Sequence, residues 1–227
     1  LFGSGGQFRM SGEVLSSFIA NYVASQPTPL VEFVWQGGEP MLAGLDFFKR
    51  VVKLQQPFCS RKTIRNSIQT NGTLLTDEWC AFLKKHNFMV GISLDGPKEI
   101  HDRYRRDRKG AGSFDLVIRG LKLLQKHEVE YNVLACVARE TAHKPLDVYH
   151  FFKKQGVEFI QFSPVVERMP DSSSMQLGLR LAGPASLKEE DCAEVTPWSV
   201  IPEEYGDFLI AIYEEWVRHD VGNVFVM

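Results

Sequence analysis

The sequence predicts an α/β fold in which mostly parallel strands are joined by helices. Stretches with the character of apolar strands alternate with amphipathic helical stretches, about five times along the chain. Right-handed helical crossovers are the usual connection between parallel strands. Polar residues and glycines recur where the apolar strands stop. Because 227 residues suffice for one sizeable core, we expect a single domain over residues 1–227.

The helices are predicted from apolar residues that recur every three or four positions. In the first helix these are Val14, Leu15, Phe18, Ile19 and Tyr22. Ser11 is expected to cap this helix, and a Pro-Thr-Pro sequence ends it. Further helices are expected at 45–55, 77–86 with Thr76 as the cap, 114–127, 145–155 and 203–219.

The strands are predicted from short apolar or alternating runs. Residues 30–35 form an apolar run that indicates a strand buried on both faces. A charged loop is expected before the helix at 114, and residues 167–200 are expected to be an irregular excursion. The other strands are expected at 63–70, 89–94, 130–137 and 158–164, with a further strand at 224–227.

This alternation is compatible with an open doubly wound sheet or with a closed or partial barrel. In both architectures the ligand site lies at the C-terminal ends of the strands. The residues that follow each strand are therefore the first candidates for a functional site.

Composition excludes several classes of partner. The formal net charge is −2, so neither a nucleic acid nor an anionic membrane is expected to bind. The charge run 103–109 is expected to be a solvated loop. No apolar run approaches the ~18 residues of a membrane span. Residues 1–6 do not resemble a signal peptide and are expected to be a truncation point or a cloning scar.

The four cysteines are Cys59, Cys80, Cys136 and Cys192. No two are close in sequence, so the chain contains no motif for a metal ion or an iron–sulfur cluster. Cys80 and Cys136 lie in apolar stretches and are expected to be buried. Scattered cysteines of this kind are typical of the reducing cytoplasm.

The strand ends carry the candidate ligand contacts. Glu39 follows Gln36-Gly37-Gly38 and could hold a cationic amine, while Gln69, Asn71 and Ser93 could bond a polar ligand. Arg105 could bind a carboxylate through two parallel hydrogen bonds. Each motif alone is also a common turn signal. Their recurrence after several strands favours a ligand site on this edge of the sheet, to which Asp95, Gln161 and Val166 also belong.

Four of these segments, in order, resemble the radical S-adenosylmethionine (radical SAM) enzymes, and within them the anaerobic sulfatase-maturating enzymes. They are Trp35-Gln36-Gly37-Gly38-Glu39-Pro40, Gln69-Thr70-Asn71-Gly72, Ser93-Leu94-Asp95-Gly96-Pro97 and His101-Asp102-Arg103-Tyr104-Arg105. The resemblance extends from about Met10 to Met227 and includes Gln161-Phe162 and Thr196-Pro197-Trp198-Ser199. It implies a partial (β/α)6 barrel.

The resemblance also implies a reaction. A [4Fe–4S] cluster reduces SAM to a 5′-deoxyadenosyl radical, and the radical takes a hydrogen atom from a Cys or Ser of a sulfatase, which becomes formylglycine. Carried over by position, Gly37, Gly38 and Glu39 would contact the methionyl amine of SAM. Ser93 and Arg105 would hold its ribose and carboxylate, and Val166 would pack near its adenine. The cavity would be lined by Gln36, Gln69, Asn71, Asp95 and Gln161.

The chain departs from this family in what it lacks. It contains neither the CxxxCxxC loop that holds the cluster nor the cysteine-rich C-terminal domain. The first strand is expected to be missing as well. We therefore expect a fragment or a truncated homologue that is inactive alone. Two alternatives stay open. The chain is either a clusterless module that binds SAM or a peptide, or the core of a radical SAM enzyme that modifies another peptide.

Overall fold

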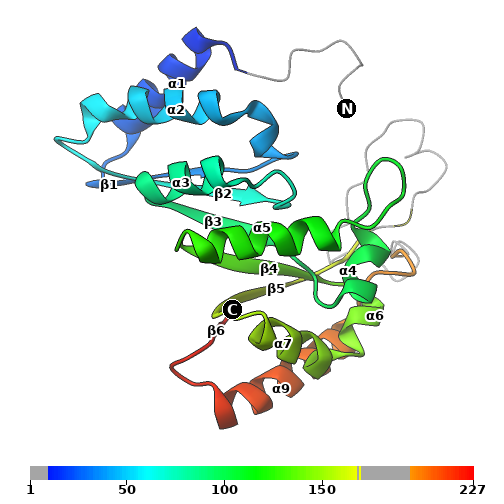
Figure 1. The fold of residues 1–227 in the computed structure, drawn as a ribbon. Helices are drawn as coiled ribbons and strands as arrows, with labels where there is room; N and C mark the ends of the chain where they lie inside the picture. The colour runs from blue at the N-terminus through cyan, green and yellow to red at the C-terminus, as the bar shows by residue number, and fades with distance from the viewer. Residues whose placement is uncertain (1–9, 168, 170–194) are drawn as a thin grey trace, which may run out of the picture. The chain divides into compact units, whose positions relative to one another are not determined.

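The structure is a computed structural model that describes residues 10–167, 169 and 195–227 (Figure 1). It consists of two compact units, each formed from two stretches of chain. The first comprises Leu1–Ser93 and Asp115–Asn132, and the second comprises Leu94–Phe114 and Val133–Met227.

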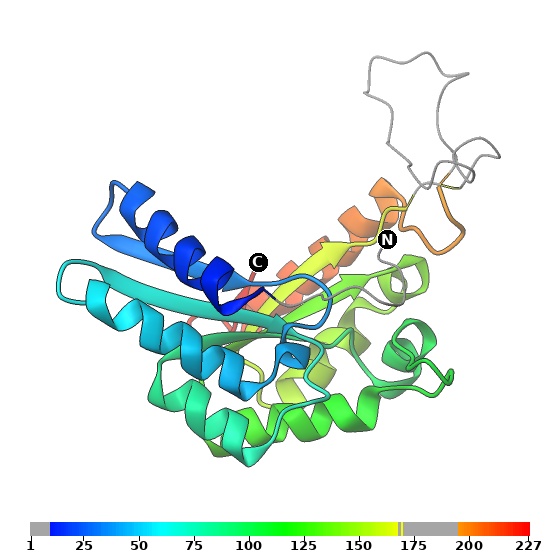
Figure 2. The ribbon, with the colours of Figure 1, turned by 90° about the horizontal axis from the view of Figure 1, so that it is seen from above.

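The first unit contains three parallel strands in chain order, β1-β2-β3. Leu30 is opposite Thr63 at the start of β1 and Trp35 is opposite Ile68 at its end. Helices α1, α2 and α3 run alongside these strands in Figure 2. The elements are α1 (Gly12–Ser25), β1 (Leu30–Trp35), η1 (Pro40–Ala43), α2 (Leu45–Gln55), η2 (Gln56–Phe58), β2 (Thr63–Thr70), α3 (Asp77–Lys85), β3 (Phe88–Ser93) and α5 (Phe114–Lys126).

Local sequence determines where these helices begin. The Ser11 hydroxyl accepts a hydrogen bond from the Val14 N–H at 3.2 Å, and the Thr76 hydroxyl accepts one from the Trp79 N–H at 3.3 Å. Both caps were predicted, and each satisfies a backbone donor that has no partner within the helix. Helix α1 then buries Leu15, Ile19 and Val23, which recur every four residues.

The prediction that residues 30–35 form a strand buried on both faces is wrong. Strand β1 buries alternate residues, and the intervening Val34 is 64% exposed. The buried face carries Phe33 and Trp35, whose rings stack with centroids 6.0 Å apart. One covered face and one open face give an alternation that the mostly apolar composition of this run does not reveal.

The second unit contains the strands β4-β5-β6, again parallel and in chain order. Its buried centre includes Tyr149, whose hydroxyl donates to Asp220 Oδ2 at 2.8 Å. Lys153 lies 2.8 Å from the same oxygen, so the buried carboxylate is paired. The elements are α4 (Lys98–Tyr104), β4 (Tyr131–Val137), α6 (Arg139–Ala142), α7 (Pro145–Lys154), β5 (Phe159–Pro164), α9 (Pro202–His219) and β6 (Phe225–Val226).

The predicted α/β class with parallel strands is confirmed, and every predicted helix and strand is present to within one or two residues at its ends. The charged loop predicted between β3 and α5 is wrong in part, because it contains α4. The excursion predicted at 167–200 lies mostly outside the described residues. Its described end, Thr196–Val200, is tied to the end of β5, since the Thr196 N–H donates to the Glu167 carbonyl and the Val200 N–H to the Val165 carbonyl. The single domain over 1–227 stays a prediction.

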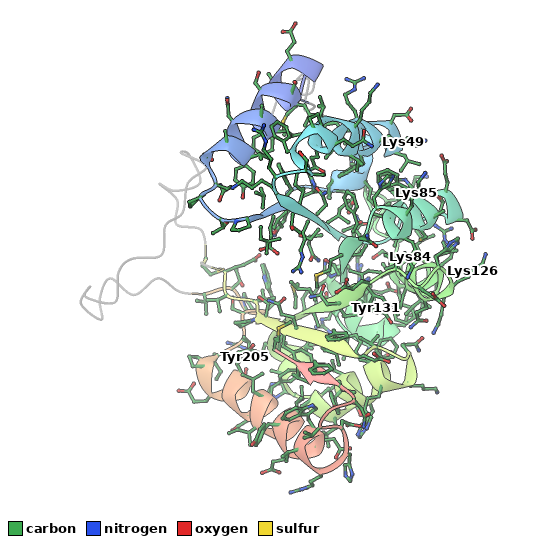
Figure 3. All side chains as sticks on the ribbon, turned by 90° about the vertical axis from the view of Figure 1, so that its left-hand side faces the viewer. Lys49, Lys84, Lys85, Lys126, Tyr131 and Tyr205 are labelled. Atoms are coloured by element: carbon green, nitrogen blue, oxygen red, sulfur yellow. The ribbon has the colours of Figure 1, made fainter. Side chains whose placement is uncertain are left out.

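Charged side chains on the helices of the first unit are paired locally. Figure 3 labels Lys49, Lys84 and Lys126 on α2, α3 and α5. Lys126 lies 2.6 Å from Asp77, and Lys49 lies 3.3 Å from Glu78. Exposed pairs of this kind contribute little to stability. Among the described helices, none combines the length and the apolar character needed to cross a membrane.

Helix α5 packs closely over the turn that follows β2. A Cβ at Gly120 would lie 2.4 Å from the backbone oxygen of Gly72, so only glycine permits this approach. We expect Gly120→Ala to lower the free energy of unfolding by about 1–3 kcal/mol. The matched variant is Gly206→Ala in α9, where a Cβ meets nothing within 4 Å.

Gly206→Ala should raise the free energy of unfolding by up to about 1 kcal/mol, because alanine favours a helix interior. Urea unfolding followed by circular dichroism measures both variants. Equal effects of the two substitutions would contradict the close packing at Gly120.

Candidate functional site

In the first unit the ends of β1 and β2 are joined by the carboxylate of Glu39. Its Oε1 accepts from the Thr70 hydroxyl at 2.8 Å and from the Met41 N–H at 3.0 Å. Its Oε2 accepts from the Asn71 N–H at 2.8 Å. We call these residues the Glu39 clamp. Three donors fix the carboxylate, so its position is set before any ligand arrives.

Gly37 and Gly38 precede this carboxylate in conformations that favour glycine. Their φ angles are 109° and 56°. A Cβ at either position would meet no atom of the described chain within 4 Å. The backbone at the end of β1 therefore borders open space, which a ligand could enter.

Gln69 and Ser93, both predicted as ligand contacts, lie together at the ends of β2 and β3. Gln69 Nε2 donates to Ser93 Oγ at 3.1 Å. A Cβ at Gly91 would overlap the Gln69 side-chain amide, so the glycine makes room for it. The Asn71 side chain stabilises the turn after β2. Its Oδ1 accepts hydrogen bonds from the Thr73 N–H at 3.0 Å and from the Thr73 hydroxyl at 2.8 Å.

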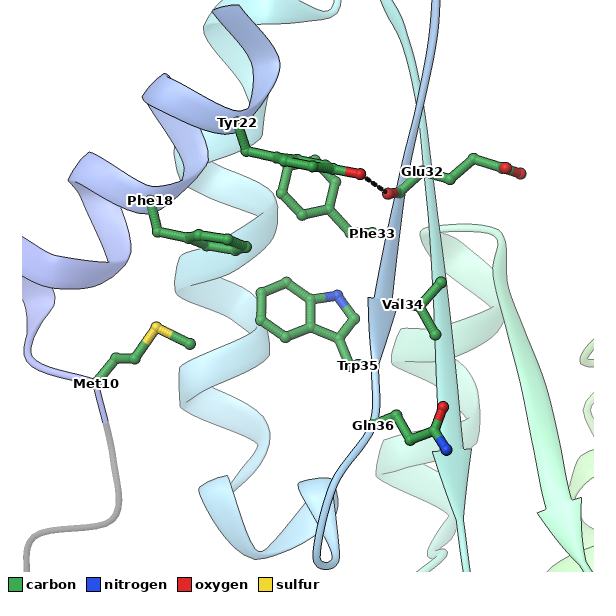
Figure 4. A pocket seen from close by; sticks show the side chains of 8 residues that line it. All are labelled: Met10, Phe18, Tyr22, Glu32, Phe33, Val34, Trp35 and Gln36. Atoms are coloured by element: carbon green, nitrogen blue, oxygen red, sulfur yellow. Dashed lines mark hydrogen bonds between the residues drawn. The ribbon is translucent and has the colours of Figure 1, made fainter. Parts of the chain in front are cut away.

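Gln36 is exposed and lies beside a pocket of about 380 Å³ between α1 and β1 (Figure 4). The rings of Phe18, Phe33 and Trp35 form its apolar wall. Glu32, Val34 and Gln36 point to the other side of the strand in Figure 4, as alternation along a strand requires. The Tyr22 hydroxyl donates to the backbone oxygen of Glu32 at 3.0 Å.

In the second unit Asp95 and Arg105 form an ion pair with two hydrogen bonds. Arg105 Nε donates to Asp95 Oδ2 at 2.6 Å, and Arg105 Nη2 donates to Asp95 Oδ1 at 2.9 Å. The Cys136 N–H also donates to Oδ1, at 2.9 Å. Asp95 was predicted to line a cavity, but its side chain is 4% exposed and its carboxylate is bound by the chain itself. Arg105 was predicted to bind a ligand carboxylate through two parallel hydrogen bonds, and in the structure it makes two such bonds to Asp95.

Cys136 lies at this ion pair, with Sγ 3.4 Å from Arg105 Nη2. It is half-buried, whereas the sequence predicted full burial; the corresponding prediction for Cys80 is confirmed. Burial raises the pKa of the Cys136 thiol, and the neighbouring Asp95 carboxylate adds to this rise. The thiol is therefore protonated at neutral pH and donates no charge to the ion pair.

His101 and Ser113 connect the two ends of the segment between Asp95 and Arg105. The Asp95 N–H donates to His101 Nδ1 at 3.3 Å, and His101 Nε2 lies 3.0 Å from Ser113 Oγ. The Ser113 hydroxyl donates to the Arg105 backbone oxygen at 3.0 Å. Burial lowers the pKa of His101 to about 4. Neither residue was predicted to have a role, although His101 begins the His101–Arg105 motif that resembles the family.

Gln161 and Val166 lie on β5 and just beyond it. Gln161 is half-buried and pairs in register with Leu134, while Val166 is 62% exposed. Next to Val166, the Glu167 carboxylate accepts from Trp198 Nε1 at 2.7 Å. The structure thus groups Glu39 with Asn71, Gln69 with Ser93, and Asp95 with Arg105. The roles of all these residues toward a cofactor stay predictions.

Comparison with known proteins decides the family. The model of the radical SAM superfamily matches residues 18–152, which is more than half of the chain. The chain belongs to the radical SAM superfamily.

Relatives within this superfamily are sulfatase maturases. The chain is 48% identical over 217 residues to the serine-type anaerobic sulfatase-maturating enzyme of Bacteroides thetaiotaomicron, covering 96% of the chain and 51% of that enzyme. It is 36% identical over 195 residues to the cysteine-type enzyme of Clostridium novyi, covering 86% and 47%. Native anSMEcpe, solved with bound AdoMet and the Cp18Cys peptide, has a TM-score of 0.81 and 33% identity, covering 96% and 55%. The chain spans about half the length of the curated relatives it matches.

Radical SAM enzymes use SAM and a [4Fe–4S] cluster. The first unit fits SAM, because Gly37 and Gly38 expose backbone beside a fixed carboxylate and would lose this space to a Cβ. The cluster does not fit the part of the chain that the structure describes. That part contains no group of three or more His, Cys, Asp or Glu side chains able to hold a metal ion.

The Glu39 clamp is expected to contribute to the stability of this radical SAM domain. In Glu39→Gln an NH2 group replaces one carboxylate oxygen and faces at least one donor of the clamp. We expect a loss of about 1–3 kcal/mol in the free energy of unfolding. Glu78→Gln is the matched control, since the Glu78 carboxylate is 73% exposed and should change stability by less than about 0.5 kcal/mol. Equal stability of the two variants in urea would contradict the clamp.

The buried His101 makes stability depend on pH. Its pKa is about 4 in the folded protein and 6.5 when unperturbed, so the unfolded chain binds more protons between these values. The free energy of unfolding should fall as the pH drops from 6.5 towards 4, by at most roughly 3 kcal/mol from this residue.

The measurement is urea unfolding at several pH values. His101→Gln should flatten the fall in stability, while His143→Gln, at an exposed histidine, should leave it unchanged. A pH dependence in His101→Gln that equals the wild-type dependence would show that His101 is not buried in its neutral form.

Proposed function

We propose that this chain is the core of an anaerobic sulfatase-maturating enzyme, which oxidises a Ser or Cys side chain of a sulfatase to formylglycine. The observation that carries the proposal is the 48% identity to a serine-type maturase over 96% of the chain. The order of the strand-end motifs supports it. Under this proposal the partner is an unfolded segment of a sulfatase polypeptide in the cytoplasm.

The first unit would bind the methionyl part of SAM. The Glu39 carboxylate accepts three hydrogen bonds and has room for more, because its two oxygens offer about four acceptor sites. An ammonium group that enters the open space at Gly37 and Gly38 would reach this carboxylate and the exposed backbone. Ser93, already oriented by Gln69, would bond the ribose.

The second unit would supply Arg105 and Val166. Within the described residues, Nη1 of Arg105 has no hydrogen-bond partner, and this nitrogen would donate to the SAM carboxylate. The exposed Val166 would offer an apolar surface to the adenine. Bound SAM supplies a 5′-deoxyadenosyl radical in this family, and these residues would orient it and exclude water. The described residues offer no ligand set for the cluster, so we assign it to none of them.

The activity test uses the protein as the cell makes it, with SAM, a reductant and peptides that contain the sulfatase target as Ser or as Cys. Mass spectrometry should show formylglycine together with 5′-deoxyadenosine. An iron and sulfide assay on the 227-residue chain accompanies it, because we expect this chain alone to lack a stoichiometric cluster. SAM or peptide binding without any turnover by the natural protein would instead favour the clusterless module.

The binding test compares two glycines that both have a positive φ angle. Gly38→Ala fills the space proposed for the amine, whereas Gly222→Ala places a Cβ at another positive φ with nothing within 4 Å. We expect Gly38→Ala and Ser93→Ala to weaken SAM binding at least about tenfold, and Gly222→Ala to leave it unchanged. Isothermal titration calorimetry on the natural protein measures all three. Wild-type affinity in both Gly38→Ala and Ser93→Ala would show that the site is assigned wrongly.

A further inference from the structure

The hydrogen bonds around His101 define its protonation state. A backbone N–H can only donate, so His101 Nδ1, which receives the Asp95 N–H at 3.3 Å, carries no hydrogen. The single hydrogen of the neutral ring is therefore on Nε2 and is donated to Ser113 Oγ at 3.0 Å. The Ser113 hydroxyl then donates its own hydrogen to the Arg105 backbone oxygen.

These bonds close a ring. They run from the Asp95 backbone through His101 and Ser113 to the Arg105 backbone, and the Arg105 side chain returns to the Asp95 carboxylate at 2.6 and 2.9 Å. The Arg105 N–H also donates to the His101 backbone oxygen at 2.9 Å. We call this arrangement the Asp95–Arg105 ring. It fixes both the backbone and the side chain of Arg105, which is 26% exposed.

We propose that His101 and Ser113 are positioning residues that, through the Asp95–Arg105 ring, aim the remaining Arg105 Nη1 donors at an anionic ligand group. Nη1 is the part of the guanidinium that has no partner among the described residues. The identity of the ligand, the carboxylate of SAM, rests on the proposed function. The Asp95–Arg105 ring does not depend on the proposed function.

The ring requires a neutral His101. Protonation would place a hydrogen on Nδ1, opposite the Asp95 N–H, and the first bond of the ring would be lost. His101 is fully buried, and its ring centroid lies 6.0 Å from that of Phe114. The charged groups that act on it are Asp95 and Asp102, which favour protonation, and Arg105 and Lys98, which oppose it. Burial outweighs them and keeps the pKa at about 4.

Nitrogen-15 NMR of the histidine rings tests the first step. At about pH 5.5, where exposed histidines are largely protonated, His101 should remain neutral with its hydrogen on Nε2. The signal that disappears in His101→Gln is that of His101, and the one that disappears in His143→Gln is that of an exposed histidine. Because two variants support the assignment, the result does not depend on the folding of either one alone. A protonated His101 at this pH, or a hydrogen on Nδ1, overturns the proposal.

Three serine variants of the natural protein test the positioning role. Ser113→Ala breaks the ring, Ser113→Thr keeps the hydroxyl, and Ser17→Ala changes an exposed serine of α1 as the control. The Ser113 hydroxyl bonds to His101 Nε2 and to the Arg105 backbone oxygen are both lost in Ser113→Ala, and only the Ser113 N–H, at 3.1 Å, still donates to that oxygen. We therefore expect the Arg105 Nε–H to exchange with water at least about tenfold faster in Ser113→Ala alone. SAM affinity should fall in the same variant and recover in Ser113→Thr.

The two readouts separate the two proposals. Faster Arg105 exchange with unchanged SAM affinity in Ser113→Ala overturns the positioning role, and unchanged exchange overturns the ring. If the wild type does not bind SAM at all, the proposed function fails, and the histidine and Arg105 signals then decide the ring by themselves.

Discussion

The first unit depends on one carboxylate that serves two strands. Glu39 follows β1, begins η1 through the Met41 N–H, and accepts from Thr70 and Asn71 at the end of β2. These bonds hold the two strand ends in register at the edge where ligands of parallel α/β sheets bind. Gly37 and Gly38, which directly precede Glu39, are exposed, and a Cβ at either position would meet nothing within 4 Å.

The second unit uses a carboxylate in the same way but neutralises its charge. Asp95 accepts from the Cys136 backbone and from Nε and Nη2 of Arg105. A buried carboxylate is costly unless it is paired and hydrogen-bonded, and here both conditions hold. At both strand ends, then, the acidic side chain first organises its own chain. The groups that remain for a ligand are the free acceptor sites of Glu39 with the neighbouring backbone in the first unit, and Nη1 of Arg105 in the second.

The sequence predicted features that depend on neighbouring residues. The caps Ser11 and Thr76 act within three positions, so the pattern alone locates them. Helix α4 was missed because its seven residues, Lys98–Tyr104, are mostly charged and bury only Ile100 and His101, too few to show a helical period. The exposure of Val34 depends on what covers each face of β1, which an apolar run does not encode.

The candidate site shows the same limit. Glycines and polar residues after the strands indicated where ligand contacts gather, but not that Asp95 would take up the two-bond geometry of Arg105. That pairing joins residues ten positions apart through the turn at Gly96. Which ring nitrogen of His101 donates and which accepts follows only from the structure, in which the Asp95 N–H points at Nδ1. Such contacts are determined by tertiary structure. A sequence motif identifies the residues but not their hydrogen-bond partners.

The charges at the two strand ends differ, and each end therefore favours a different kind of ligand group. Within the described residues Glu39 makes no ion pair, and its three donors are a hydroxyl and two backbone N–H groups. Its negative charge is hydrogen-bonded but not cancelled, so a cation is attracted to it. The charge of Asp95 is cancelled by Arg105, and Nη1 remains as a donor. The strand end of the first unit therefore favours a cationic group, and that of the second unit, through Arg105 Nη1, favours a hydrogen-bond acceptor.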